Sequence, residues 1–190
     1  ASADFHTNCY ASTIMSTDSR PYLYRDIEYL GGAHAFAAEV LEAINKEVLF
    51  DEFYQYEIEE LCRFMHCFSA PTGTVLLQEG EEGDHLIILL TGQVIVRKTD
   101  IGGTVHSLAM VGPGSILGEM SLIDGERRFA SCIAAETSRF AAMSKSDLNE
   151  ILALHPRLAN KFLTMLLQIM VSRLRDMGTR AIAPLSKPFI

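Results

Sequence analysis

The segment 118–131 reads GEMSLIDGERRFAS, and the rest of the chain is arranged around it. A glycine that permits close approach of the backbone is followed by a helix-compatible run, a second glycine and a basic pair. Glu119 and Arg128 are nine residues apart, so the loop between them can fold back and present a carboxylate and a guanidinium to one small ligand. Backbone N–H groups at the start of the short helix would add donors for an anion. The segment predicts a site for a sugar hydroxyl and a phosphate, with a surface ion pair as the alternative.

Length and charge restrict the classes of protein to consider. The 190 residues and the 48% hydrophobic fraction suit one globular domain, with or without appended helices. A formal net charge of −8 argues against a nucleic-acid surface, which requires clustered basic side chains. No apolar run is long enough to cross a bilayer, and residues 1–19 do not resemble a secretory signal. We therefore expect a cytoplasmic protein with no nucleic-acid or membrane partner on this chain.

The cysteines and histidines show no metal-binding pattern. Cys9, Cys62, Cys67 and Cys132 form no Cys-x-x-Cys pair, so we interpret them as buried free thiols, with a disulfide or metal site as the alternative. The six histidines are scattered, which disfavours a metal-dependent jelly-roll enzyme of the cupin kind. Neither a phosphate-binding P-loop nor a nucleophile-elbow serine is present, so no enzymatic activity is expected.

The N-terminal part, from about Asp18 to Phe68, is predicted to be helical. Helices are expected over 33–46 and 54–65, because apolar residues recur there on one stripe. A short helix or loop is expected around 22–30, and Asp51 is expected to cap the helix over 54–65.

From Pro71 to about Ser144 the pattern predicts strands. Ten of the thirteen glycines fall between 73 and 125 and divide this part into short runs. The apolar run 86–90 is typical of a strand buried on both faces, and Ile101-Gly102-Gly103 predicts a hairpin. We expect a closed or two-layered antiparallel β-roll, with strands at 74–78, 85–90, 93–98, 104–111, 129–134 and 138–144.

Helical periodicity returns after Lys145. Ser144 or Ser146 is expected to cap a helix that runs to His155, and Pro156 interrupts it and starts the next. The last helix, roughly 157–177, is expected to stop at Gly178, with Arg173 and Arg175 in its final turn.

Two apolar stripes lie on this last helix. One of them, Phe162, Leu166 and Ile169, is suited to docking on the β-roll. The other repeats at spacings of four, three, four and three residues, as in a coiled-coil seam, and predicts a homodimer. The alternative is burial of both stripes in the core of one subunit. The members of the predicted seam are Leu163, Leu167, Met170, Leu174 and Met177.

The order of these features closely resembles the cyclic nucleotide-binding domain family, which includes the bacterial catabolite activator protein, kinase regulatory subunits and nucleotide-gated channels. Independent marks in the right order support the resemblance. They are Gly73, the turn 79–84, Gly92 and Gly112-Pro113-Gly114, all before the segment 118–131.

The resemblance covers about 50–177 and implies an α+β fold. Its centre would be an antiparallel, jelly-roll-like β-roll flanked by N-terminal helices and a long C-terminal helix. We accordingly expect a tail and helices over 1–49, the nucleotide-binding domain with its dimerisation helix over 50–177, and a tail over 178–190.

The resemblance also implies roles for the residues of the segment 118–131. The glutamate that matches Glu119 accepts a hydrogen bond from the ribose 2′-hydroxyl, and the arginine that matches Arg128 pairs with the cyclic phosphate. A carboxylate can only accept, and a planar guanidinium can engage two phosphate oxygens, so the chemistry is sound. Backbone N–H groups near Gly118 and Ala130 and the Ser131 hydroxyl would complete the site. The expected ligand-binding residues are Gly118, Glu119, Met120, Arg128, Phe129, Ala130 and Ser131, with no metal or other cofactor.

Two positions depart from the family pattern. Arg127 stands where many members have proline or a neutral residue, and we expect it to face solvent; turned inward, it would add a second charge for the phosphate. Phe129 stands where a family threonine often accompanies a preference for cyclic GMP, so its presence favours cyclic AMP. A bulky ring there would also be able to narrow the pocket.

The expected function is that of a sensor that binds cyclic AMP, or cyclic GMP, and signals to a separate, unidentified effector protein. The thirteen residues after Met177 are too few for a helix-turn-helix domain, and no kinase or channel segment is present. Gln168 or Ser172 of the last helix, from either subunit, is expected to face the base and couple ligand to dimer geometry. The alternative is a structural or interaction domain with an occluded or vestigial pocket.

Overall fold

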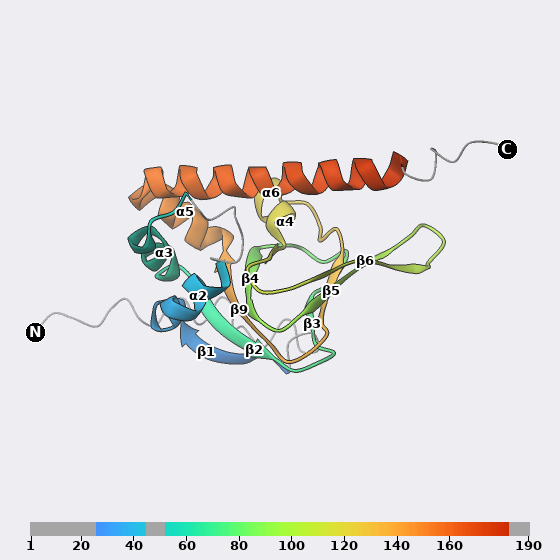
Figure 1. The fold of residues 1–190 in the computed structure, drawn as a ribbon, viewed down its shortest axis with the longest axis horizontal. Helices are drawn as coiled ribbons and strands as arrows, with labels where there is room; N and C mark the ends of the chain where they lie inside the picture. Colours follow the sequence, from blue (N-terminus) through green and yellow to red (C-terminus); the bar gives the residue numbers. More distant parts are fainter. Residues whose placement is uncertain (1–25, 45–51, 183–190) are drawn as a thin grey trace, which may run out of the picture.

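The protein folds into two antiparallel sheets with helices packed on one side of them (Figure 1). The computed structural model describes residues 26–44 and 52–182, with only the backbone for 180–182. In chain order the elements are β1 (Glu28–Gly32), the 3-10 helix η1 (Ala33–Phe36), α2 (Ala37–Ile44), α3 (Gln55–Cys62), β2 (His66–Ala70), β3 (Val75–Leu77), β4 (His85–Thr91), β5 (Val94–Thr99), β6 (Val105–Val111), β7 (Ile116–Leu117), α4 (Glu119–Asp124), β8 (Ser131–Ala134), β9 (Ser138–Ser144), α5 (Lys145–Leu154) and α6 (Pro156–Ile182).

The sheet topology confirms the expected α+β fold built on an antiparallel β-roll. The larger sheet has the strand order β1-β2-β9-β4-β7 and the smaller one β3-β8-β5-β6. Every pair of neighbouring strands is antiparallel. All six strands expected between 74 and 144 are present, although the run 129–134 forms a strand only from Ser131.

Strand β4 connects the two halves of the core. Its apolar run 86–90 is buried throughout, as the sequence predicts. Because side chains alternate along a strand, Leu86, Ile88 and Leu90 face the helices, while Ile87 and Leu89 face the space between the sheets. One strand thus carries two apolar layers, which holds the β-roll and the helical layer in a fixed relation.

The C-terminal helices cover the outer face of the larger sheet. At the start of α5 the Ser144 hydroxyl accepts from the Asp147 N–H at 3.1 Å, which confirms Ser144 as the cap. Helix α6 begins at Pro156, and the expected docking stripe of Phe162, Leu166 and Ile169 is buried. In Figure 1 α6 runs along the top of the molecule, over α5 and α4, and continues above the side where the β5–β6 hairpin projects.

The prediction that 18–68 is helical is wrong in two places. Residues 66–70 form β2, which pairs with both β1 and β9, and β1 lies at the end of the expected short helix or loop. The stripe 58, 61 and 65 is apolar and buried as expected, but α3 ends at Cys62. The N–H groups of residues 63–65 donate to carbonyls three residues earlier, and strand pairing begins at His66. Helix α3 is capped at Tyr54, while Cys9, Lys46 and Asp51 lie outside the described residues.

The predicted end of the last helix is also wrong. Helix α6 continues through Gly178 to Ile182, so Arg173 is more than two turns from its end. A glycine inside a helix costs only about 1 kcal/mol relative to alanine, which a 27-residue helix with a docked face tolerates. The role expected for Arg173 at the helix terminus is therefore replaced by a different one.

Candidate ligand-binding site

The site is built around Gly118, which joins β7 to α4. Its φ of +82° lies in the left-handed region, where glycine is favoured. A Cβ atom at this position would lie 2.6 Å from Nη1 of Arg128 and 3.0 Å from Leu77. Glycine is thus required both by the backbone conformation and by the close approach of Arg128. A second glycine in the left-handed region, Gly125, ends α4, and its N–H donates to the backbone carbonyl of Ser121 at 3.0 Å.

Arg128 is buried beside this turn and is held by backbone carbonyls. Only 4% of its surface is exposed. Its Nη1 donates to the Gly118 carbonyl at 2.9 Å and its Nη2 to the His85 carbonyl at 2.7 Å. Its own N–H donates to the Glu81 carbonyl at 2.8 Å, which ties it to the turn 79–84. These carbonyls orient the guanidinium, and a buried guanidinium is suited to bind an anion.

The turn 79–84 fits closely against the same group. A Cβ atom at Gly83 would lie 2.2 Å from the Ser121 Cβ and 3.0 Å from Cζ of Arg128. The glycine therefore lets this turn pack directly on α4 and on the guanidinium. Two marks that support the sequence resemblance, this turn and the segment 118–131, are in contact in the structure.

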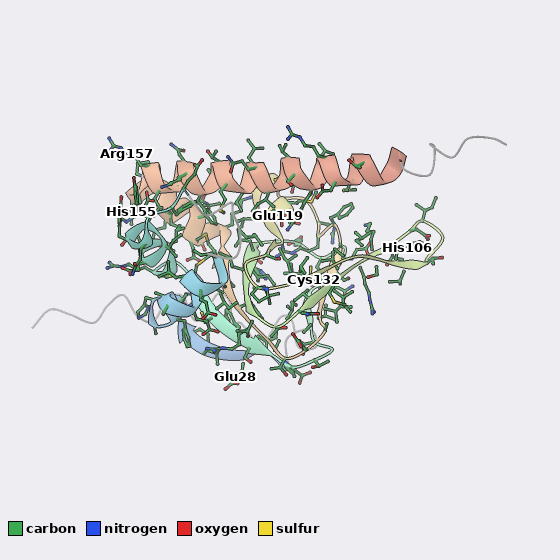
Figure 2. The ribbon with its side chains drawn as sticks, in the orientation of Figure 1. Glu28, His106, Glu119, Cys132, His155 and Arg157 are labelled. Carbon is green, nitrogen blue, oxygen red and sulfur yellow. The ribbon has the colours of Figure 1, made fainter. Side chains whose placement is uncertain are left out.

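Glu119 opens α4 and is almost completely buried, with 2% of its surface exposed. Its Oε1 accepts a hydrogen bond from Nη1 of Arg173, which reaches down from α6. Nη2 of the same arginine donates to the Ile116 carbonyl at 2.6 Å. Figure 2 shows Glu119 beneath α6, whereas His106 lies far away on the β5–β6 hairpin. A cation from the C-terminal helix thus compensates the buried carboxylate.

The pKa of the Cys132 thiol responds to the charged side chains of this cluster. Its pKa is raised to about 12, mainly by burial and also by the charge of Glu119, while Arg128 and Arg173 oppose the rise. Glu119 and both arginines therefore lie close enough to act on one buried atom. The thiol stays protonated at neutral pH, so Cys132 is part of the apolar lining. Cys62 and Cys67 are also buried and free, which confirms the interpretation for the three cysteines within the described residues.

The remaining predicted site residues lie at the edge of this cluster. The Ser131 hydroxyl accepts from the Glu79 N–H at 3.0 Å, and so already supports the turn 79–84. Met120 is 39% exposed and Ala130 is partly buried. Arg127 is exposed and donates to the Gly80 carbonyl at 2.7 Å, which confirms that it points away from the site.

Phe129 lies on the surface rather than in the core. Its ring is 44% exposed, with Nζ of Lys98 4.8 Å from the ring centroid. Lys98 also pairs with Glu79 at 2.7 Å. The ring therefore belongs to an exposed cation–aromatic contact between the start of β8 and β5.

Gln168 and Ser172, expected to face the base, do not point at Glu119 in the same chain. They line an open groove of about 440 Å³ on the exposed face of α6. At 100° per residue, Ser172 and Gln168 lie about 100° and 140° around the helix from Arg173. A contact of these side chains with the base would have to come from a second subunit.

Sequence reasoning missed Arg173 as a site residue. The available signal was its position, since Arg173 continues the buried stripe of Phe162, Leu166 and Ile169 by one further step of four residues. A charged residue at the next position of a docking stripe must find a partner or stay at the edge of the interface. Here that partner is Glu119.

Within the described residues, no three His, Cys, Asp or Glu side chains are grouped so that they could hold a metal ion. The helices of the same residues include none that is both long and apolar enough to span a bilayer.

Comparisons with known proteins agree with this geometry. The family model for the cyclic nucleotide-binding domain matches residues 68–155. A solved cyclic nucleotide-binding domain from Methylobacillus flagellatus KT is 41% identical, covers 89% of this chain and 94% of its own, and superposes with a TM-score of 0.79.

Curated relatives match over the same region. The cyclic AMP receptor protein of Thermus thermophilus is 32% identical over 106 residues, which are 56% of this chain and 47% of the relative. A cAMP-dependent protein kinase regulatory subunit of Aspergillus fumigatus is 28% identical over 112 residues, 58% of this chain and 26% of the relative. The chain thus spans less than half the length of these two relatives. By its fold, its matching segment and its likeness to a whole solved domain, the chain belongs to the cyclic nucleotide-binding domain family.

Proposed function

We propose that this chain binds a cyclic nucleotide, with cyclic AMP preferred over cyclic GMP, and acts as a sensor that regulates a separate effector protein in the cytoplasm. The observation that supports the proposal is that Glu119 and Arg128 are both buried beside Gly118. Glu119 would accept from the ribose 2′-hydroxyl and Arg128 would bind the cyclic phosphate. A buried carboxylate and a buried guanidinium at one glycine turn are costly to maintain for stability alone.

Two features support cyclic AMP. Phe129 has no hydroxyl or amide with which to recognise the polar edge of guanine. The names of the Thermus thermophilus and Aspergillus fumigatus relatives both refer to cyclic AMP. Neither feature concerns the phosphate or the ribose, so the choice of base is separable from the rest of the proposal.

The proposal is tested by isothermal titration with cyclic AMP, cyclic GMP and linear AMP. We expect binding of cyclic AMP that Arg128→Ala weakens by about 2 to 5 kcal/mol, the range for removing one partner of a buried charge pair. At 1.4 kcal/mol per decade this is a loss of tens to thousands of fold. The matched control is Arg127→Ala, which removes an exposed neighbour and should change affinity little. Equal losses of affinity in the two variants would show that Arg128 is not the residue that binds the phosphate.

A structural or interaction domain with a vestigial pocket is the second candidate. The observation in its favour is that Arg128 and Glu119 both have protein partners without any ligand. The same titration separates the two functions, because the second predicts no binding of either cyclic nucleotide. Absence of binding that persists in Phe129→Ala, which removes the ring suspected of narrowing the pocket, would establish the second candidate.

The proposed assembly is a homodimer through α6. Leu167, Leu174 and Met177 of the predicted seam are 60%, 70% and 59% exposed. Leu163 and Met170 are partly buried, and Leu163 packs against the subunit's own core. Three large apolar side chains exposed on one helix are suited to contact with a second copy. In such a dimer, Gln168 and Ser172 of one subunit could reach the site of the other.

A further inference from the structure

We propose that the segment 183–190, which follows α6 directly, pairs as an additional strand with the outer edge of β6 in the same chain. The structural basis is an exposed edge strand on the side of the molecule above which α6 ends (Figure 1). The inference goes beyond the proposed function, because it concerns a contact within the protein and does not depend on a nucleotide.

Strand β6 lies at the edge of the smaller sheet. Among the described residues it pairs with β5 alone, and every residue of β6 except the last is exposed. Where the hairpin begins, the N–H of Asp100 donates to the carbonyl of Thr104 at 2.9 Å. Because backbone groups alternate between the two edges of a strand, the N–H groups of Val105 and Ser107 point away from β5. An edge of this kind is a template for pairing with a further strand.

Two large apolar side chains stand beside this edge. Val105 and Met110 are 58% and 61% exposed. Their partners in β5 are Thr99 and Ile95, which lie on one face of that strand because side chains alternate. A register shift in the ladder shows one extra residue in β6 between the two positions. Val105 and Met110 therefore share a face and are spaced like residues four positions apart in a regular strand.

The segment 183–190 has the backbone pattern that this edge requires. It reads APLSKPFI, and Pro184 opposes continuation of α6 because proline lacks the N–H that a helix interior needs. In an extended chain the N–H groups of successive residues point to opposite edges, so the two prolines, four positions apart, remove donors from one edge only. The other edge keeps the N–H groups of Leu185, Lys187 and Phe189.

The apolar side chains of the segment match those of β6. Leu185 and Phe189 are four positions apart and lie on one face of an extended chain. When the edge with the intact donors faces β6, one of them lies beside Val105 and the other beside Met110. Such cross-strand pairs of apolar side chains stabilise a sheet. The donors and the apolar side chains of the segment thus fit the same edge at the same time.

The position of α6 brings the segment within reach of β6. Arg173 attaches the helix to β7 through its bond to the Ile116 carbonyl at 2.6 Å, and the helix then continues to Ile182. In Figure 1 this end lies above the side where the β5–β6 hairpin projects. Eight extended residues span up to about 26 Å. Packed layers of a protein are only about 10 Å apart, so the segment is long enough to run along the strand.

The pairing gives the segment a protective role. It covers an edge that would otherwise be able to pair with other chains. It also connects the end of α6 to the strand that leads through Gly112-Pro113-Gly114 to β7 and Gly118. A protein that offers an extended segment of its own to β6 must first displace residues 183–190.

The test uses the two edges of the segment. Amide hydrogen exchange at Val105 and Ser107 is measured by NMR for the unmodified chain, Lys187→Pro and Ser186→Pro. In the unmodified chain we expect exchange at both N–H groups to be about tenfold or more slower than in an unstructured chain. Lys187→Pro removes a donor that faces β6 and should abolish this protection. Ser186→Pro is the matched control, because it places a proline on the edge that already carries two, and should keep the protection.

Further variants separate the backbone from the side chains. Lys187→Ala removes the charge but keeps the N–H, and should retain the protection. Phe189→Ser should weaken the protection by about threefold or more, because it removes one of the two apolar contacts. The N–H of Leu89, which is buried in β4 and donates to the Ser115 carbonyl at 3.0 Å, is followed in every sample to show that the fold is intact.

Other outcomes would overturn the inference. Fast exchange at Val105 and Ser107 in the unmodified chain would do so, as would protection that persists in Lys187→Pro. Equal loss of protection in Lys187→Pro and Ser186→Pro would show that the segment does not pair as a strand. Protection that increases with protein concentration would assign the edge of β6 to a second copy of the chain in place of its own segment.

Discussion

At the scale of single residues, the glycine at 118 explains why the site can exist at all. Arg128 is buried against the backbone of Gly118, with its Nη1 2.9 Å from the carbonyl, and a side chain at 118 would occupy the same space. The left-handed backbone adds a second reason for glycine. Conformational and steric demands usually act together at such positions, but this chain offers a way to separate them.

The separation uses Gly118→Ala and Gly103→Ala. Both glycines have nearly the same φ, +82° and +83°, but nothing lies within 4 Å of a Cβ at Gly103 in the β5–β6 hairpin. Each substitution should cost about 1 to 2 kcal/mol of unfolding free energy for the left-handed backbone. Only Gly118→Ala should also displace Arg128 and lower cyclic AMP affinity, by about tenfold or more.

The measurements for this pair are urea unfolding and isothermal titration. If Gly103→Ala loses as much nucleotide affinity as Gly118→Ala, the loss reflects general destabilisation and not the contact with Arg128. If Gly118→Ala binds normally, the close fit between Gly118 and Arg128 is not required for the ligand.

At the scale of elements, α6 is attached to the rest of the domain at three places along its length. Near its start Lys161 pairs with Glu57 of α3 at 2.5 Å. The apolar stripe through Phe162 and Ile169 follows, and Arg173 makes the contact with α4. The two ion pairs lie at opposite ends of the apolar contact and so fix the rotation of the helix as well as its position.

The first of these pairs predicts a pH dependence of stability. Burial alone would raise the pKa of the Glu57 carboxyl, but the hydrogen bonds from Lys161 and from the Tyr54 N–H lower it below its ordinary value. A carboxyl with a lowered folded-state pKa stabilises the fold above its unfolded pKa. That contribution is lost as the pH falls through the lowered value.

We therefore expect the unmodified chain to lose more unfolding free energy than Glu57→Gln between about pH 5 and pH 3, since glutamate titrates near 4.3 when unperturbed. The measurement is chemical unfolding at a series of pH values. The control is Glu59→Gln on the same helix, whose exposed side chain accepts from the neutral Gln55 amide. Parallel pH profiles for the unmodified chain and Glu57→Gln would contradict the stabilising role of the pair with Lys161.

At the scale of the whole molecule, the parts that sequence reasoning could predict are those with a local signal. Glycines divide the β-roll into its strands, and the run 86–90 marks the central one. By contrast, β1 pairs with β2, and β2 pairs in turn with β9, which lies more than sixty residues later, so no local pattern specifies these two strands. For the same reason Glu119 and Arg128 could be predicted within one segment, whereas Arg173 is 54 residues from Glu119 and meets it only through the docking of α6.

The proposed dimer connects the site to the surface of the molecule. Arg173 contacts Glu119, and the next residue, Leu174, is 70% exposed on the predicted seam. A ligand that favours one position of α6 must also favour the dimer geometry that goes with it, because the helix is common to both contacts. Nucleotide binding at Glu119 and the angle between the subunits are then coupled, because Arg173 and Leu174 are adjacent residues of the same helix.

Small-angle X-ray scattering with and without cyclic AMP tests this link. We expect a dimer for the unmodified chain, whose scattering profile changes when the nucleotide is saturating. Leu174→Asp should place a charge in the seam and give a monomer that still binds, with a profile that the ligand changes much less. Leu154→Asp, at a leucine of α5 that is 60% exposed, is the matched control and should remain a dimer. A monomeric unmodified chain would remove the seam, whereas a dimer with the same profile in both states would leave ligand binding unlinked to subunit geometry.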